Sequence, residues 1–315
     1  MYFKIEDDKE KIIYTIIYDD KVRRIFVENN KEIQVGSIVH ARVKSVDANR
    51  NFSFIQLDGE DGFYNAADLK AGEDYFFNVR KKPSGEKGYK LDRNIKIKIK
   101  GAIGFPLGKE FYNNPMEKIT GFPVKSKADD PDLARELKST WEGILKEQSR
   151  LPIPKVVYRE ASESEKYIEK YQEDLGDHAA MLRAMANTPE LTGRIIECEE
   201  GSLIIDSKDH FTFVDFNTDD YSKSYNRDLN HLDLNEKLLI EAIRILTLRN
   251  IEGMILIDIL KLKDYGDFIK ITKNILKSQG YYFHDITKLE LMEITRRKTG
   301  RKYIDQDIIN KIMGI

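Results

Sequence analysis

The chain has 315 residues, of which 41% are hydrophobic and 34% charged, and its formal net charge is −2. This length allows two or three domains with cores of their own, and the near-neutral charge gives no overall signal for nucleic-acid binding. The charged start, MYFKIEDDKE, and the lack of a long apolar run predict neither a signal peptide nor a membrane span. The single cysteine, Cys198, excludes an internal disulfide and a cysteine-built zinc site within one chain, so we expect a cytoplasmic protein.

The first 93 residues are typical of short β-strands. IIYTIIY and VRRIFVE flank a polar turn at Asp19–Asp20, which predicts a β-hairpin within residues 1–34. Residues 35–93 then hold several short strand-like segments with glycine and proline turns between them, a pattern that indicates a small barrel. These segments are SIVHARVKSVD, FSFIQLD, DGFYNAADL, YFFNVRKK and GYKLD.

Positive charge is concentrated in two places. Residues 78–100 hold nine Lys or Arg against only Glu86 and Asp92, and RRKTGRK spans Arg296 to Lys302. Such clusters attract phosphate, although runs of charge are often no more than solvated surface.

The middle of the chain, residues 94–190, is mixed. A strand-like NIKIKIK precedes a passage rich in glycine and proline, and a helix is predicted over 130–148 with Asp130 or Asp132 as its cap. Further helices are predicted over 162–175 and between Asp177 and Pro189.

Residues 191–279 contain two apolar runs that each end in an aspartate. FTFVDFN carries Asp215, GMILIDIL carries Asp258, and the segment between them has a helical period. Strand–helix–strand is the unit of a parallel sheet, so both aspartates should lie close together at one sheet edge. Another helix should end at Gly280, a strand is expected at YYFHDI, and residues 288–299 should lead into a final short helix. We interpret His284, in that strand, as structural.

The two aspartates predict a metal site. A carboxylate in an apolar strand is costly unless something compensates its charge, and a shared divalent cation would do so. Two carboxylates with the amide oxygen of Asn217 suit Mg²⁺. The alternative is structural: Asp258 would cap the turn after its strand, and Asp215 and Asn217 would form a hydrogen-bonded loop.

Aromatic residues mark the predicted barrel. Phe54 and Phe63 lie in two strand-like segments whose side chains alternate between the faces, and Phe52 and Tyr64 are their neighbours. Exposed rings on a barrel face can stack on unpaired bases, whereas rings that point inward would belong to the core.

Four blocks, in order, resemble the ribonuclease E/G family. They are residues 36–69, 210–217, 234–260 and 289–299. The resemblance implies a mixed α+β protein in which an RNase H-like α/β core is interrupted by an OB-fold RNA-binding barrel and a second α/β insertion. The core would comprise 1–34 and 191–279, the barrel 35–93, the sensor-like insertion 94–190, and a truncated C-terminal subdomain 280–315.

The same resemblance implies an Mg²⁺-dependent endoribonuclease that cuts single-stranded RNA during processing or decay and leaves a 5′-phosphate and a 3′-hydroxyl. It matches Asp215 and Asp258 to metal-binding aspartates and Asn217 to the asparagine that assists them. It also matches Phe54 and Phe63 to rings that hold an RNA base. It further matches Lys87, in GEKG, to a basic residue of the barrel that contacts the phosphate chain.

Other positions depart from the family pattern. The arginine–threonine pair that binds a 5′-monophosphate is best matched by Lys125 and Ser126, but lysine lacks the bidentate fork of arginine. Thr218, Asp219 and Asp220 follow the first aspartate, and Lys261 stands where a second acid is often found. The cysteine pair that links family subunits through zinc is not matched, so no zinc-linked dimer is expected.

Three functions remain open from the sequence. RNA would lie across the barrel, with its backbone steered by residues 78–100 and by Arg296 and Arg297, and would be cut at the aspartates. Alternatively, the chain is a catalytically weak or inactive RNA-binding protein, because of Lys261. The third possibility is a scaffold of an RNA-processing assembly, whose weak RNA affinity would be insensitive to salt.

Overall fold

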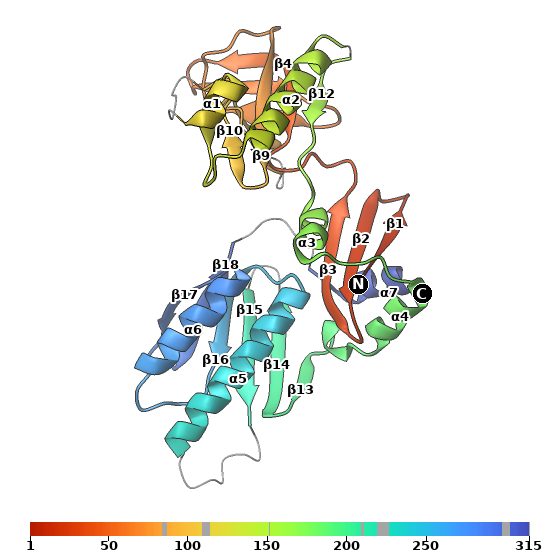
Figure 1. Cartoon of the computed structure of the whole chain (residues 1–315). Coiled ribbons are helices and arrows are strands. Elements are labelled where there is room, and N and C mark those ends of the chain that lie inside the picture. Colours follow the sequence, from red (N-terminus) through yellow and green to blue (C-terminus); the bar gives the residue numbers. More distant parts are fainter. Residues whose placement is uncertain are drawn as a thin grey trace. The chain divides into compact units, whose positions relative to one another are not determined.

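The computed structural model describes residues 1–83, 87–108, 114–150, 152–208, 211–218, 227–297 and 303–314, of which 227–230 are described by their backbone alone. The chain divides into two compact units (Figure 1). One, the two-segment unit, combines Met1–Asn30 with Glu163–Ile315, and the other, the inserted unit, is Lys31–Ser162. No helix within the described ranges is both long enough and apolar enough to cross a membrane.

The inserted unit contains a closed barrel of five strands. Its strands run in the order β4, β5, β6, β8, β7, and β7 pairs with β4 to close the ring. They are β4 (Ile38–Asp47), β5 (Phe52–Gln56), β6 (Asp61–Tyr64), β7 (Asp74–Lys81) and β8 (Tyr89–Asp92). The β6–β8 pair is parallel and the other barrel pairs are antiparallel. The predicted barrel is therefore confirmed.

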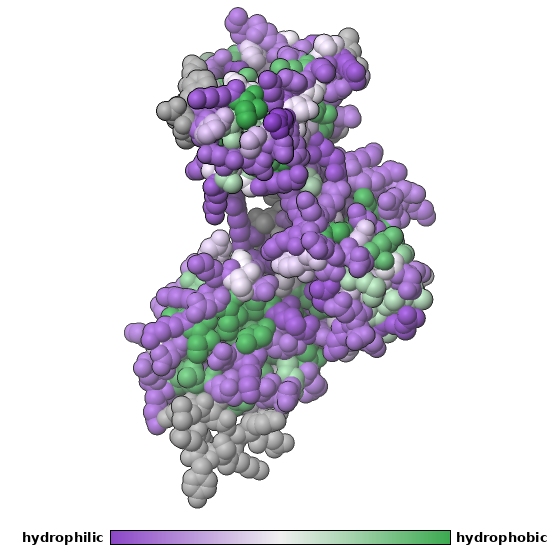
Figure 2. All heavy atoms as spheres, viewed as in Figure 1, coloured by the Kyte–Doolittle hydropathy of each residue, from purple (hydrophilic) through white to green (hydrophobic). Residues whose placement is uncertain are grey.

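The rest of the inserted unit comprises a small sheet, two helices and a strand that joins the barrel sheet. The small sheet has β9 (Ile97–Ile99), β10 (Ala102–Gly104) and β11 (Val124–Lys125), the helices are α1 (Pro115–Thr120) and α2 (Pro131–Gln148), and β12 (Lys155–Tyr158) pairs with β4. The predicted α2 is confirmed, and Asp130 is its cap, because its carboxylate accepts from the backbone N–H of Asp132 at 2.9 Å. Leu133 and Leu137 of α2 are buried in a core that includes Ile97. The surface of this unit seen in Figure 2 is mostly hydrophilic.

His40 makes the stability of the inserted unit depend on pH. The residue is only 4% exposed, its ring lies 5.0 Å from that of Phe76, and its buried Nδ1 has no hydrogen-bond partner among the described residues. Burial lowers the pKa of His40, although Asp74 acts in the opposite direction. Below about pH 6.5 the unfolded chain therefore binds a proton that the folded chain resists, and stability falls as the pH falls.

We expect the loss to approach about 1.4 kcal/mol per pH unit until the folded histidine titrates. Trp141 is the chain's one tryptophan and its ring lies 5.8 Å from that of Phe76, so its fluorescence reports unfolding of this unit. Urea unfolding at pH 7.5 and 5.5 should show the drop in wild type and a smaller one in His40→Phe. Equal drops in both proteins would contradict the assignment.

The N-terminal strands of the two-segment unit form a sheet of their own. This three-stranded antiparallel sheet has the order β1 (Tyr2–Asp7), β2 (Ile12–Tyr18), β3 (Val22–Asn29). The hairpin predicted around Asp19–Asp20 is confirmed as β2–β3. The resemblance implies one core made of 1–34 and 191–279, but the strands after residue 190 form a separate sheet and do not pair with β1–β3.

Helices from distant parts of the chain cover the β1–β3 sheet. They are α3 (Glu163–Tyr171), α4 (His178–Ala186) and α7 (Gln306–Met313), with a 3₁₀ turn η1 at Pro189–Leu191. Ile16 and Ile25 of the sheet share a buried core with Met181 of α4 and Ile309 of α7. The N- and C-terminal parts of the chain therefore depend on one another for burial of this core.

The second sheet of this unit has six strands in the order β13-β14-β15-β16-β18-β17. They are β13 (Ile195–Cys198), β14 (Gly201–Lys208), β15 (Phe211–Asn217), β16 (Gly253–Asp258), β17 (Tyr281–Ile286) and β18 (Leu291–Arg296). Only β15 and β16 pair in parallel, and α5 (Arg227–Leu248) connects them, so the predicted strand–helix–strand unit is confirmed. Within the block 288–299 the structure adds a strand, β18, which the sequence analysis did not predict, and the final short helix expected after this block is α7.

Two helices cover one face of the six-stranded sheet. These are α5 and α6 (Gly266–Gln279), which lie side by side on it (Figure 1). Val214 and Phe216 of β15 and Ile257 of β16 belong to the core beneath the helices. Because side chains alternate along a strand, Asp215 and Asp258 lie on the other face, which we call the open face.

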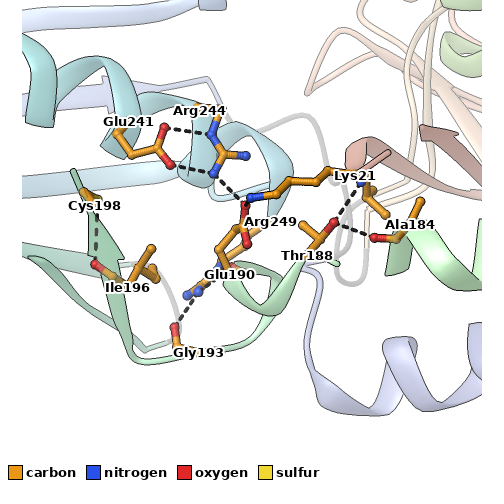
Figure 3. A network of polar contacts seen from close by, with 11 residues as sticks. Lys21, Ala184, Thr188, Glu190, Gly193, Ile196, Cys198, Glu241, Arg244 and Arg249 are labelled. Carbon is orange, nitrogen blue, oxygen red and sulfur yellow. Dashed lines mark hydrogen bonds and ion pairs between the residues drawn. The ribbon is translucent and has the colours of Figure 1, made fainter. Parts of the chain in front are cut away.

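Polar contacts join the two sheets (Figure 3). Glu190 of η1 is 6% exposed, and its carboxylate accepts from Arg244 of α5 at 2.9 Å and lies 3.8 Å from Nζ of Lys21, in the β2–β3 turn. Arg249, 2% exposed, donates two hydrogen bonds to the backbone carbonyl of Glu190 and one to that of Gly193. The segment between the sheets is therefore held by Arg244, within α5, and by Arg249, the first residue after that helix.

Candidate metal centre and nucleic-acid interface

The two aspartates predicted to meet are direct neighbours. Asp215 is the partner of Asp258 in the parallel β15–β16 register, each near the carboxyl end of its strand. Both side chains are half-buried. The pairing of the two strands begins at Phe211 and Met254. Each aspartate is the fifth residue of its paired segment, so the register places the two aspartates opposite each other.

The pair has the electrostatics of an uncompensated acid site. Burial, then the negative charge of Asp215, then that of Glu290, raises the pKa of Asp258 above its usual range. A cation held between the two carboxylates would remove the repulsion that causes part of this shift. The donor set thus suits a hard divalent cation, because Mg²⁺ commonly takes one or two protein carboxylates and completes its shell with water and substrate phosphate.

Asn217 lies on the same face as Asp215, one alternation further along β15. It pairs in register with Ser202, and Gly201 approaches so closely that a Cβ there would lie 2.2 Å from the carbonyl oxygen of Asn217. Gly201 also has a φ of +148°, which side chains rarely adopt. Glycine at 201 therefore allows β14 to pack against the end of the strand that carries Asp215 and Asn217.

Asn235 of α5 holds the chain just beyond Asp258, a role that our reading of the sequence missed. It is fully buried, its amide nitrogen donates to the carbonyl of Leu260 at 2.8 Å, and its amide oxygen accepts from the backbone N–H of Leu260 at 2.8 Å. Nδ1 of His231 lies 2.9 Å from the carbonyl oxygen of Lys261. The helix therefore fixes the segment that directly follows Asp258.

Lys261 does not lie free beside the aspartates. Its ammonium pairs with Glu290 at 2.8 Å, and both belong to segments next to the end of β16. Within the described part of the chain, no three side chains of His, Cys, Asp or Glu come together as a metal-binding group. Asp219 and Asp220 lie outside the described residues, and Thr218 follows Asn217 half-buried.

The barrel aromatics form a cluster in the inserted unit. Phe54 and Phe63 are cross-strand partners on β5 and β6, and Phe52 stacks on Phe63 at 5.3 Å and meets Phe54 edge-on at 5.0 Å. Phe54 is 42% exposed, while Phe52 and Phe63 are half-buried. Lys90 of β8 pairs in register with Phe63, which places a cation next to the rings.

Part of the basic segment 78–100 is already paired. Arg80 binds Asp92 at 3.0 Å, Lys82 binds Glu32 at 2.5 Å and Lys100 binds Glu136 at 3.2 Å. Lys87 is exposed next to β8. The segment therefore offers fewer available cations than its composition indicates.

The remaining predicted contacts lie in different environments. Lys125, at the end of β11, is exposed, and the hydroxyl of Ser126 accepts from the backbone N–H of Ala128 at 3.3 Å. Arg296 is buried, 6% exposed, with its guanidinium 4.9 Å from the Tyr281 ring, whereas Arg297 is exposed. Arg296 therefore lies on the helix-covered face of the sheet, with Met292 and Ile294. Residues 298–302, the rest of that cluster, lie outside the described residues.

His284 fits the structural interpretation. It is exposed on β17, and its Nε2 lies 2.7 Å from the hydroxyl of Thr295 on the neighbouring strand β18. This contact joins two strands and leaves the aspartate pair untouched.

Comparison with protein families places part of the chain. Residues 163–299 match the model of the Ribonuclease E/G family. The matched range begins at the return of the chain into the two-segment unit and includes both aspartates. No curated protein matches the chain.

Proposed function

Because residues 163–299 belong to the Ribonuclease E/G family, we propose that this protein is an endoribonuclease that cuts single-stranded RNA with the help of Mg²⁺. The family supports ribonuclease activity in general. The observation that carries the finer proposal is the pair Asp215–Asp258, in register on adjacent parallel strands and on the open face of the sheet.

In this proposal the chain supplies the ligands and their support. Asp215 and Asp258 would hold the cation, and Asn217 would hydrogen-bond to a water or phosphate oxygen beside it. Asn235 would keep the turn after Asp258 in place. When bound, Mg²⁺ would activate a water for in-line attack and neutralise charge on the scissile phosphate, which would leave a 5′-phosphate and a 3′-hydroxyl.

The barrel supports binding of single-stranded RNA. Its strand order and its parallel β6–β8 pair suit an OB-fold, which binds oligonucleotides on its sheet face. Phe54 and Phe63 would stack on bases, and Lys87 would contact phosphate. Lys125 and Ser126 are the candidate contacts for a 5′-monophosphate, and Arg297 is a candidate backbone contact in the two-segment unit.

The direct test uses an unstructured RNA labelled at its 3′ end and carrying a 5′-monophosphate. Incubation with Mg²⁺ should give internal cuts whose downstream products carry a 5′-phosphate, which a 5′-phosphate-dependent exonuclease detects. EDTA should stop the cutting, and a 5′-hydroxyl substrate would show whether the 5′ end matters. RNA that stays bound and intact in Mg²⁺ would support the alternative, a protein that binds RNA without cutting it.

We expect Phe54→Ala to weaken RNA binding by about 1 to 3 kcal/mol, the usual contribution of stacking one base on an aromatic ring. Binding should be measured by fluorescence anisotropy in EDTA, so that no RNA is cut. Leu145→Ala is the matched control, because Leu145 lies on α2 of the same unit and is also 42% exposed. Equal affinities of the two variants would exclude Phe54 from the RNA contact.

A further inference from the structure

The open face of the six-stranded sheet carries a second feature beyond the aspartates. Phe211 pairs in register with Met254, Met254 with Thr295, and Thr295 with Tyr282. These four side chains therefore form one line across β15, β16, β18 and β17, which we call the aromatic row. By strand alternation the row lies on the same face as Asp215 and Asp258.

The row is unusually exposed for large apolar side chains. Phe211 is 42% exposed, Met254 59% and Tyr282 59%. Between this row and the aspartates, Phe213 and Leu256 are half-buried. Exposed apolar residues that stand side by side, rather than singly, indicate a surface that contacts another molecule.

The charges around the aromatic row favour a polyanion. Lys208 is the register partner of Phe211 and is exposed, and Arg297, two residues after Thr295, is exposed on the side of the row away from the aspartates. Asp206 and Glu293 lie nearer the aspartates, and the charge of Asp206 is compensated by Arg194 at 2.6 and 2.8 Å. Cations thus flank the row, while Asp206 and Glu293 lie toward the candidate metal.

We propose that the aromatic row stacks on bases of the single-stranded RNA whose backbone reaches Asp215 and Asp258. Asp215 lies four residue steps after Phe211 along β15, so the two are about 13 Å apart at roughly 3.3 Å per step. That distance corresponds to about four nucleotides of a stacked strand, at roughly 3.4 Å each, and to fewer of an extended one. The row would therefore contact nucleotides close to the cut, and this inference rests on the proposed function.

Rings and a flexible methionine read bases without strict sequence preference, since every base has a π-face. The row would add a contact to RNA within the two-segment unit itself, independent of the barrel. Cleavage efficiency should then depend on the presence of bases at fixed steps from the cut, whatever their identity.

The test combines abasic RNAs with protein variants. One cleavable RNA is prepared intact and with a single abasic nucleotide at each of the positions one to four steps from the cut, on both sides. Affinity in EDTA and kcat/KM in Mg²⁺ are measured for wild type, Phe211→Ala and Tyr282→Ala. Ile240→Ala, whose side chain is 49% exposed on α5, is the control, and unfolding curves confirm that all variants fold.

At one or two positions, the abasic substitution should weaken wild-type binding by between about fivefold and a hundredfold. Phe211→Ala or Tyr282→Ala should weaken binding of intact RNA by a similar factor and be insensitive to the same abasic nucleotide. Losses that multiply independently at every position, or variants that bind as wild type, would overturn the inference. A change of oligomeric state in the variants, without loss of RNA affinity, would also overturn it and identify the row as a protein interface.

The outcomes separate this inference from the proposed function. Cleavage of intact RNA by wild type establishes the nuclease, whatever the row variants do. If wild type cuts nothing, the binding measurements in EDTA still decide whether the row contacts bases.

Discussion

Asp258→Asn should abolish most RNA cleavage and at the same time stabilise the metal-free protein. If the two aspartates hold Mg²⁺ as proposed, loss of one carboxylate should lower kcat/KM by at least about 100-fold, because the cation that activates water would be held weakly. Stability should rise at neutral pH, since the substitution removes the charge that burial and Asp215 disfavour. Cleavage assays and thermal unfolding in EDTA measure the two effects on one protein.

The opposite signs of the two effects distinguish a metal ligand from a structural residue. If Asp258 served only to cap its turn, the substitution would lower the unfolding midpoint and leave the dependence on Mg²⁺ intact. Asp215→Asn should behave as Asp258→Asn does toward cleavage, as its register partner. Asp267→Asn is the control, because Asp267 is an exposed acid at the start of α6 that pairs only locally with Lys270.

Arg249→Ala should cost the two-segment unit about 3 to 5 kcal/mol of unfolding free energy. The substitution leaves the buried carbonyls of Glu190 and Gly193 without their donor, at roughly 1 to 3 kcal/mol each, and opens a cavity. Burial lowers the pKa of Arg249, so its charge is disfavoured there, and interactions with Tyr303 and Glu190 act in the opposite direction. Urea unfolding followed by far-ultraviolet circular dichroism measures the loss.

Two further variants test the cause. Arg249→Lys keeps the positive charge without the planar fork, so it should fall between wild type and Arg249→Ala. Arg194→Ala removes an arginine whose partner Asp206 is exposed, and it should leave the unfolding midpoint nearly unchanged. A similar loss for Arg194→Ala and Arg249→Ala would contradict the role of burial.

The sequence was sufficient for the parts of the fold that repeat a clear period. The barrel strands and the β15–α5–β16 unit follow from alternating or helical patterns, and the pairing of Asp215 with Asp258 follows from the parallel arrangement. By contrast, β18 was missed because the alternation of Met292 and Ile294 lies within a charged stretch. β13 and β14 were missed for the same reason, since acidic residues surround their apolar positions.

The sequence predicted that the two aspartates meet, but it did not predict the environments of the residues around the candidate sites. Asn235 acts on a backbone group 25 residues away, so its role depends on tertiary contacts that a local pattern does not contain. The sequence analysis predicted that Arg296 and Arg297 both contact RNA. Because side chains alternate along a strand, Arg296 is buried on the helix-covered face of the sheet, whereas Arg297 is exposed. Neighbours in a charge cluster therefore had opposite environments because they lie on a strand.

The shared core of β1–β3, α4 and α7 has a consequence for how the protein is made. During synthesis the inserted unit is complete at Ser162 and can fold, while the strand IIYTIIY has emerged long before its partners. Its buried face must wait for Met181 and finally for Ile308 and Ile312, nearly 300 residues later in the chain than Ile12. In that interval β2 is an exposed apolar strand, so the nascent chain depends on chaperones or on speed to avoid aggregation.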